Sequence, residues 1–376
     1  MNICKSRLTV GSGILLVCWF LLFVPAGANA APQDQYDKII AGCTQAIAEN
    51  PQDENAYYIR GSAYAEKKQY DMAIIDFNKA ITINPNFNEA YINRGSVYLQ
   101  KGLFDQAIAD LSKVIAINPQ HAVAYNTRGL AYFNKEQYAK AVADYDKAIA
   151  INPHYAIAYN NRGLAYMQQG QYDQAIADFN QAIAINPKYA KAYYNRGLAY
   201  FNKEQYDRAI NDYDETIAIN PHYPQAYNNR GLAYERKGEY DQAIADFNQA
   251  ININPQDAKV YYNRGSVYLT KQQYDQAIAD FNQAIAIDPR LDRTYGSRGV
   301  AFAQRNQYDK AIGDFNQAIA LNPRDEAHYY NKAFIYEKTG KTREAVDAYR
   351  QFLTLASPED TERIEHAKQY IAKLKE

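Results

Sequence analysis

A period of 34 residues constrains this chain more than any other feature of its sequence. An Arg-Gly pair recurs at that spacing, at positions 60, 94, 128, 162, 196, 230, 264 and 298. Prolines recur at the same spacing, from Pro51 to Pro323. A fixed period between about 20 and 50 residues is typical of solenoids, in which each repeat buries its apolar surface only against its neighbours. The 376 residues therefore predict a stack of repeats rather than one globular core.

The repeating unit has the pattern of two short helices. Residues 156–189 contain two segments with apolar and aromatic residues at helical spacing, separated by Gly170-Gln171. Asn186-Pro187 follows the second segment, and a residue before proline avoids the α region, so the second helix should end there. Asp173 stands at the start of the second segment, where we expect it to cap the helix. The unit is predicted to be a helix–turn–helix hairpin.

This unit resembles the tetratricopeptide repeat, whose pattern is W-x2-L-G-x2-Y, then A-x3-F, then P. The corresponding residues here are Tyr159, Arg162, Gly163, Tyr166, Ala175, Phe179 and Pro187. The resemblance implies an all-α, right-handed superhelical solenoid. Nine full repeats, residues 54–359, are expected to begin at Glu54, Asn88, Ala122, Ala156, Ala190, Pro224, Ala258, Asp292 and Glu326. Residues 31–53 should form an N-terminal half-repeat or capping helix, and residues 360–376 a C-terminal capping helix.

Residues 1–30 have the pattern of a signal peptide. Lys5 and Arg7 precede the apolar run Ile14–Val24, and Ala28-Asn29-Ala30 provides small residues for cleavage before Ala31. The mature protein is therefore expected in an exported compartment: periplasm, lumen or extracellular space. An uncleaved anchor is the alternative, although the apolar run is short for a membrane span. No other membrane segment is expected, and Cys43, the single cysteine left after cleavage, is expected to be a buried thiol.

The arginine of each Arg-Gly pair departs from the apolar residue of the family pattern. Burying an unpaired charge is costly, so each arginine should have an acidic partner. An aspartate follows each one by sixteen residues, from Asp76 to Asp314, whereas the ninth repeat lacks both and has Lys332 and Ala348. We therefore predict an Arg–Asp ion pair inside each of the first eight repeats.

The composition and motifs indicate no catalytic chemistry. With 41 Lys and Arg against 42 Asp and Glu, the chain is unsuited to non-specific nucleic-acid binding. His154 and His222 lie two repeats apart, too far to share a metal, and His328 and His366 are expected to be isolated. None of the usual catalytic or phosphate-binding motifs is present. We expect no enzyme activity, no cofactor and no metal.

A row of asparagines provides the candidate site. In the tetratricopeptide domain of O-linked N-acetylglucosamine transferase, an asparagine ladder holds the backbone of an extended peptide in the concave groove, and the residues before the arginines here resemble it. The resemblance implies peptide contacts by Asn93, Asn126, Asn160, Asn161, Asn195, Asn228, Asn229, Asn263 and Asn331. A primary amide suits this role because it donates and accepts at once.

Two alternatives stay open at this stage. The repeats are close copies, so the asparagines can also be a duplicated, solvated face without a ligand. Near-identical repeats can also stack end to end, which would make the protein a self-associating structural oligomer. The sequence favours an exported scaffold that binds extended segments of other proteins, with the partner, the peptide preference and the oligomeric state left undetermined.

Overall fold

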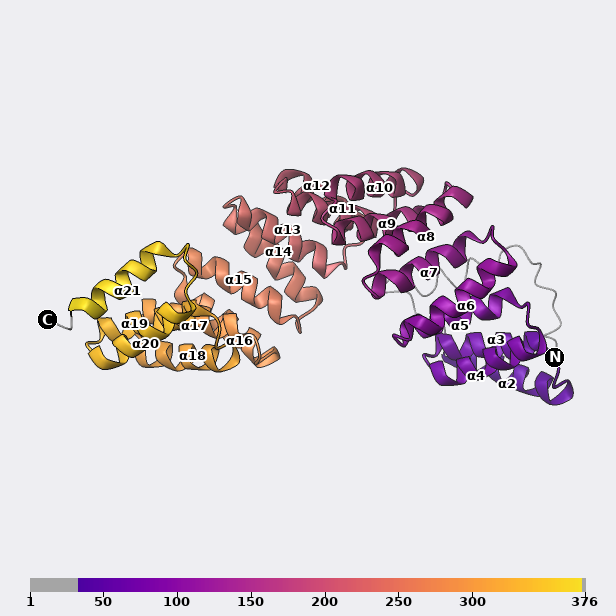
Figure 1. The fold of residues 1–376 in the computed structure, drawn as a ribbon, viewed down its shortest axis with the longest axis horizontal. Helices are drawn as coiled ribbons and strands as arrows, with labels where there is room; N and C mark the ends of the chain where they lie inside the picture. The colour runs from indigo at the N-terminus through magenta and orange to yellow at the C-terminus, as the bar shows by residue number, and fades with distance from the viewer. Residues whose placement is uncertain (1–32, 374–376) are drawn as a thin grey trace. The chain divides into compact units, whose positions relative to one another are not determined.

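The computed structural model describes residues 33–373, which form twenty helices and no strand (Figure 1). The chain divides after Lys203 into two compact units. The helices of the first unit are α2 Gln33–Glu49, α3 Glu54–Glu66, α4 Tyr70–Ile83, α5 Asn88–Gln100, α6 Phe104–Ile117, α7 Ala122–Asn134, α8 Tyr138–Ile151, α9 Ala156–Gln168, α10 Tyr172–Ile185 and α11 Ala190–Asn202. The helices of the second unit are α12 Tyr206–Ile219, α13 Pro224–Arg236, α14 Tyr240–Ile253, α15 Ala258–Thr270, α16 Tyr274–Ile287, α17 Asp292–Gln304, α18 Tyr308–Leu321, α19 Glu326–Lys338, α20 Thr342–Leu355 and α21 Thr361–Lys373. The predicted signal peptide, residues 1–30, lies outside the described residues.

The odd-numbered helices from α3 to α19 are the first helices of the hairpins, and the even-numbered helices from α4 to α20 are the second helices. Each first helix begins at the residue predicted as the start of its repeat. The second helices also end as predicted. In α10, for example, the helix ends at Ile185, and Asn186 before the proline has extended backbone angles (φ −133°, ψ 91°). The repeat period thus determines the helix boundaries.

The predicted cap of the second helices is wrong. The N-cap of α10 is Gln171, whose side chain makes no capping hydrogen bond, and Asp173 lies inside the first turn. The Asp173 carboxylate instead pairs with the ammonium group of Lys203 in the turn after α11. The same 30-residue spacing joins Lys67 to Asp37, Lys101 to Asp71, Lys135 to Asp105 and Lys271 to Asp241. These pairs link consecutive repeats, and because the aspartates are exposed each pair contributes about 0.2–1 kcal/mol.

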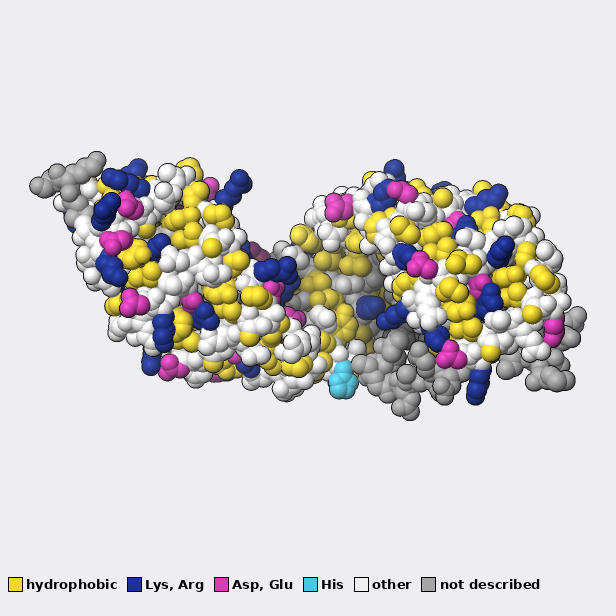
Figure 2. All heavy atoms as spheres, turned by 90° about the horizontal axis from the view of Figure 1, so that it is seen from below, with side chains coloured by type: hydrophobic (Ala, Val, Ile, Leu, Met, Phe, Trp, Pro, Cys, Tyr) yellow, Lys and Arg dark blue, Asp and Glu magenta, His cyan; other side chains and the backbone are white. Residues whose placement is uncertain are grey.

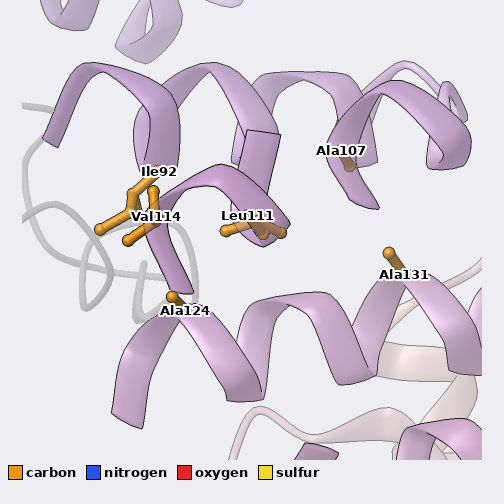
Figure 3. Close-up of a cluster of buried hydrophobic side chains, with 6 residues drawn as sticks. All are labelled: Ile92, Ala107, Leu111, Val114, Ala124 and Ala131. Carbon is orange, nitrogen blue, oxygen red and sulfur yellow. The ribbon is translucent and has the colours of Figure 1, made fainter. Parts of the chain in front are cut away.

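The core continues from one hairpin into the next. Figure 3 shows Ala107, Leu111 and Val114 of α6 between Ile92 of α5 and two alanines of α7. These side chains are 0–4% exposed. The first helix of the following hairpin therefore completes the apolar surface that α5 and α6 cannot bury alone. At the N-terminal end of the array, Cys43 of α2 is buried as predicted, with 1% of its surface exposed.

Within a hairpin, a glycine allows the two helices to approach closely. Phe179 of α10 is fully buried and lies directly over Gly163 of α9. A Cβ atom added to Gly163 would lie 2.6 Å from Cε1 of that ring, closer than van der Waals contact permits. This close approach explains why a residue that costs about 1 kcal/mol in a helix interior recurs in these repeats.

We predict that Gly163→Ala lowers the free energy of unfolding by about 1–3 kcal/mol, because the new methyl group must displace the Phe179 ring. Gly313 of α18 is the matched control, since a Cβ there would have no neighbour within 4 Å. Gly313→Ala should raise the stability by about 0.5–1 kcal/mol through helix propensity. Urea unfolding followed by circular dichroism measures both. A Gly163→Ala protein as stable as the Gly313→Ala protein would contradict the packing explanation.

Candidate functional site

The arginines of the first helices form bidentate ion pairs with aspartates of the second helices. In the fourth repeat, Nε of Arg162 donates to Oδ2 of Asp178 at 2.8 Å, and NH2 donates to Oδ1 at 2.6 Å. The predicted pairing inside a repeat is confirmed for Arg60–Asp76, Arg94–Asp110, Arg128–Asp144, Arg162–Asp178, Arg230–Asp246, Arg264–Asp280 and Arg298–Asp314. Arg196 and Asp212 have one residue in each unit, and their pairing stays a prediction. The aspartates of the seven pairs have 3–9% of their side chains exposed, so these pairs lie between the helices and not on the surface.

Each arginine also reaches back to the preceding repeat, which the sequence analysis did not foresee. NH1 of Arg162 donates to Asp146 of α8 at 2.6 Å, and NH1 of Arg128 donates to Ser112 of α6 at 2.9 Å. The hydrogen bonds to Asp178 and Asp146 raise the pKa of Arg162 above its ordinary value. One guanidinium group therefore connects three helices: its own, its partner in the hairpin, and the second helix before it.

Two columns of tyrosines surround these guanidinium groups. The Arg162 guanidinium carbon lies 5.5 Å from the ring centre of Tyr159 and 6.0 Å from that of Tyr166. Aromatic faces attract a cation at this range, so the tyrosines hold the arginine from both sides along its own helix. Their position gives these tyrosines a packing role around the ion pairs.

The asparagines before the arginines form hydrogen-bonded chains along the first helices. Asn195 of α11 donates through Nδ2 to Oδ1 of Asn160 at 2.8 Å, and Asn160 donates to Asn161 at 3.4 Å. Asn161 donates in turn to Asn126 of α7 at 3.0 Å. One chain of amides thus connects α7, α9 and α11. In the second unit, Asn263 of α15 donates to Asn228 of α13 at 2.9 Å.

Burial separates the predicted site residues into two groups. Asn93, Asn126, Asn160 and Asn195 are 3–8% exposed and buried. Asn161, Asn228, Asn229, Asn263 and Asn331 are only half-buried. Asn93 also shows what the buried group does, because its Nδ2 donates to Tyr58 Oη and Ser62 Oγ of α3, at 3.1 and 3.2 Å. The buried amides therefore join consecutive first helices, and the half-buried amides are the ones that can contact a ligand.

The sequence spacing of these amides already indicates the bonds between them. Asn126 and Asn161 are 35 residues apart, as are Asn160 and Asn195, one residue more than the repeat period. That extra residue brings two amides of successive first helices face to face. Both columns were predicted as ligand contacts, and the bonds between them were not predicted.

Half-buried leucines accompany the amides on the first helices. Leu164 follows Asn161 by three residues and Leu232 follows Asn229 by three, so each leucine lies on the same helix face as an amide. Each packs beside the core of its own repeat. The face shown in Figure 2 has hydrophobic side chains interspersed with small groups of both charges. The first helices thus offer aliphatic contacts beside the amides.

Four family profiles described as TPR repeat or tetratricopeptide repeat match the chain. The matched residues are 54–87, 89–121, 129–170, 163–204, 194–258, 258–291, 299–340 and 329–358. The chain belongs to the tetratricopeptide-repeat family. No curated protein sequence matches it.

Solved structures agree with this family. A tetratricopeptide repeat protein from Parabacteroides merdae superposes with a TM-score of 0.53 and 20% identity, covering 67% of this chain and 99% of its own. The Cut9–Hcn1 assembly of the APC/C superposes with a TM-score of 0.52 and 15% identity, covering 85% of this chain and 76% of its own. MamA is 32% identical over 42% of this chain and 93% of its own, with a TM-score of 0.39. The all-α solenoid predicted from the sequence is confirmed.

The tetratricopeptide repeat is a protein-interaction scaffold and is generally non-catalytic. None of the helices among residues 33–373 is both long and apolar enough to span a membrane. One expectation about the titratable residues is wrong, because neither His328 nor His366 is isolated. Nε2 of His366 lies 3.7 Å from Oε2 of Glu337, and the His328 ring lies within 4 Å of Asp292 and Asp325. Asp292 is the first residue of the eighth repeat, and Glu326, 34 residues later, is the first residue of the ninth. Because consecutive repeats stack in register, Asp292 lies near the first turn of α19.

We predict that Asp178→Ala lowers the free energy of unfolding by about 2–3 kcal/mol, because it leaves Arg162 without its bidentate partner. This is less than the cost for a fully buried pair, since the Arg162 side chain is 20% exposed and keeps Asp146. Asp146→Ala is the matched control: that carboxylate is 51% exposed, and its loss should cost under about 1 kcal/mol. Thermal or urea unfolding of both variants measures the difference, and equal losses would rule out a special role for the pair inside the repeat.

Proposed function

We propose that this tetratricopeptide-repeat protein is an exported scaffold that holds extended segments of other proteins against its first helices. The observation that carries the proposal is the half-buried amide row of the first helices: Asn161 of α9 in the first unit, and Asn228 and Asn229 of α13, Asn263 of α15 and Asn331 of α19 in the second unit. A peptide backbone presents one N–H and one C=O per residue, and a primary amide complements both. Binding through such contacts depends little on the side chains of the ligand.

The internal hydrogen bonds prepare these amides for a ligand. Asn263 uses one N–H to bond Asn228, which leaves a second N–H and the carbonyl oxygen for a peptide unit. Because the bond to Asn228 fixes the plane of the Asn263 side chain, a ligand need not restrict its rotation on binding. Preorganisation of this kind increases affinity by lowering the entropy cost. Asn126, Asn160 and Asn195 remain in the proposal as buried supports of Asn161, and Asn93 as a buried amide that bonds Tyr58 and Ser62.

The leucines beside the amides add apolar contacts to a bound segment. Leu164 and Leu232 are half-buried and continue the surface of Asn161 and Asn229 by one helical turn. An extended client with small or aliphatic residues at alternate positions would fit both kinds of contact. Such a client is a flexible terminus or linker, as expected for a factor that assembles or escorts other exported proteins.

We predict that replacing Asn228, Asn229 and Asn263 of the second unit by alanine weakens peptide binding at least tenfold, since each lost hydrogen bond removes about 0.5–1.5 kcal/mol. Peptides selected from a random displayed library on the wild-type protein provide the probe, and fluorescence anisotropy measures their affinity. Methylating alternate backbone nitrogens of the selected peptide should also weaken binding, whereas single side-chain changes should be tolerated.

The control for this experiment replaces exposed amides of the second helices, Gln181, Gln283 and Asn316, by alanine. Both triple variants are first compared by their urea midpoints, so that a loss of folding is not mistaken for a loss of binding. Equal affinities of the two triple variants for the selected peptides would disprove the amide row as the binding site.

The export part of the proposal is supported by the signal-peptide pattern of residues 1–30. We predict that the protein purified from its native compartment begins at Ala31, and intact-mass spectrometry measures this directly. A chain that retains residues 1–30 and requires detergent for extraction would instead establish the uncleaved anchor. Replacing Ala28 and Ala30 by bulky residues should block cleavage and serves as the control.

A further inference from the structure

One histidine of the second unit is buried without satisfying its polar atoms. His328 of α19 is 4% exposed, and neither Nδ1 nor Nε2 has a hydrogen-bond partner. The equivalent position in the first six repeats is alanine, and in the next two it is Val260 and Thr294. A buried imidazole with two unsatisfied nitrogens is unfavourable by itself, so its presence at a position of small residues requires an explanation.

The structure makes room for this ring at one particular glycine. A Cβ atom added to Gly296 of α17 would lie 2.5 Å from Cε1 and 2.8 Å from Nδ1 of His328. The equivalent position elsewhere is asparagine, tyrosine or isoleucine, for example Asn126. In the third and fourth repeats these two positions are Asn126 and Ala158. In the eighth and ninth repeats they are Gly296 and His328. Both members of the pair changed together at a single place in the array.

Two carboxylates converge on the Nε2 atom of this ring. Nε2 lies 3.9 Å from Oδ2 of Asp292 and 3.6 Å from Oδ2 of Asp325. The other oxygen of Asp325 is used already, because it caps α19 by accepting from the Ala327 N–H at 3.0 Å. Asp292 Oδ2 accepts from Nδ2 of Asn322 at 3.0 Å. Within residues 33–373 no lysine or arginine pairs with either carboxylate, so the group lacks a compensating cation.

We propose that His328, Asp292 and Asp325 bind one divalent transition-metal ion, of which Zn²⁺ is the best match. Their ligand atoms all lie within 4.8 Å of one another. Tetrahedral zinc ligands at about 2.0–2.1 Å from the metal are about 3.4 Å apart, so the observed separations need only a small closure. One imidazole nitrogen with two carboxylates suits zinc, whereas calcium and magnesium prefer oxygen donors throughout.

Asn322 has the role of an orienting residue in this site. Its hydrogen bond to Asp292 holds a ligating carboxylate in place, as the outer partners of metal ligands generally do. The ligands come from the first turns of α17 and α19, in the eighth and ninth repeats. A bound ion therefore links the last two repeats and stabilises the C-terminal end of the array.

The test is a titration of the purified, tag-free, metal-stripped chain with ZnCl₂. Calorimetry should give one site per chain, zinc should raise the thermal midpoint, and CoCl₂ should give visible absorption bands of a site with a nitrogen and oxygen donors. The double variant Gly296→Asn/His328→Ala restores the Asn126–Ala158 pairing of the other repeats, so it should fold normally. We expect it to bind zinc at least a hundredfold more weakly than the wild-type chain and to lose the cobalt bands.

Further variants separate ligands from bystanders. Asp325→Asn keeps the helix cap, because asparagine caps as well as aspartate, yet it should weaken zinc binding. Asn322→Ala should weaken it about tenfold. His222→Ala changes an exposed histidine elsewhere in the unit and should leave binding unchanged. Zinc binding retained by Gly296→Asn/His328→Ala, or lost in His222→Ala, overturns the proposal. A wild-type chain that binds no zinc also overturns it.

Discussion

Two adjacent contacts between the helices of a hairpin support the rest of this structure. Arg162 bonds Asp178, and the next residue, Gly163, receives the ring of Phe179. Both contacts span sixteen residues, so they fix the same crossing point by different means. The ring sets how close the two helices approach, and the fork of the guanidinium sets their register. Arg162 also bonds Asp146 in the second helix of the preceding hairpin. The geometry inside one hairpin therefore also determines how it stacks on the hairpin before it.

Most of this architecture could be predicted because its causes are local in sequence. The period, the prolines and the glycines determine helix boundaries through backbone sterics, and the Arg–Asp partner followed from the cost of a buried charge. The failures concern side-chain direction. Aspartate near the start of a helix is a common N-cap residue. Only the structure of α10 shows that Asp173 faces Lys203 instead. His328 was expected to be isolated because sequence spacing does not show which first turns lie side by side.

The asparagine row shows how one residue type can serve stability and binding together. An amide whose polar atoms all bonded its neighbours would have no donor or acceptor left for a ligand. An amide without any hydrogen bond would rotate freely. Asn263 does neither, because one N–H bonds Asn228 and its other polar atoms are left for a ligand. The copied-face alternative predicts the same bonds between repeats, since they help stacking. What distinguishes the two alternatives is whether the half-buried amides add affinity for a peptide.

The departures from the repeat are concentrated at the end of the array, where stacking is least constrained. The second helix of the ninth hairpin packs against the single helix α21 through Tyr349, Phe352 and Ala367. Lys332 of this hairpin replaces the arginine and lies 5.7 Å from the Tyr336 ring centre, and burial lowers the pKa of Lys332 where an ion pair would have raised it. Without the guanidinium link to the preceding second helix, the eighth and ninth repeats have one connection fewer than the other neighbouring repeats. Asp292, Asp325 and His328 occupy the place where a metal ion would supply one.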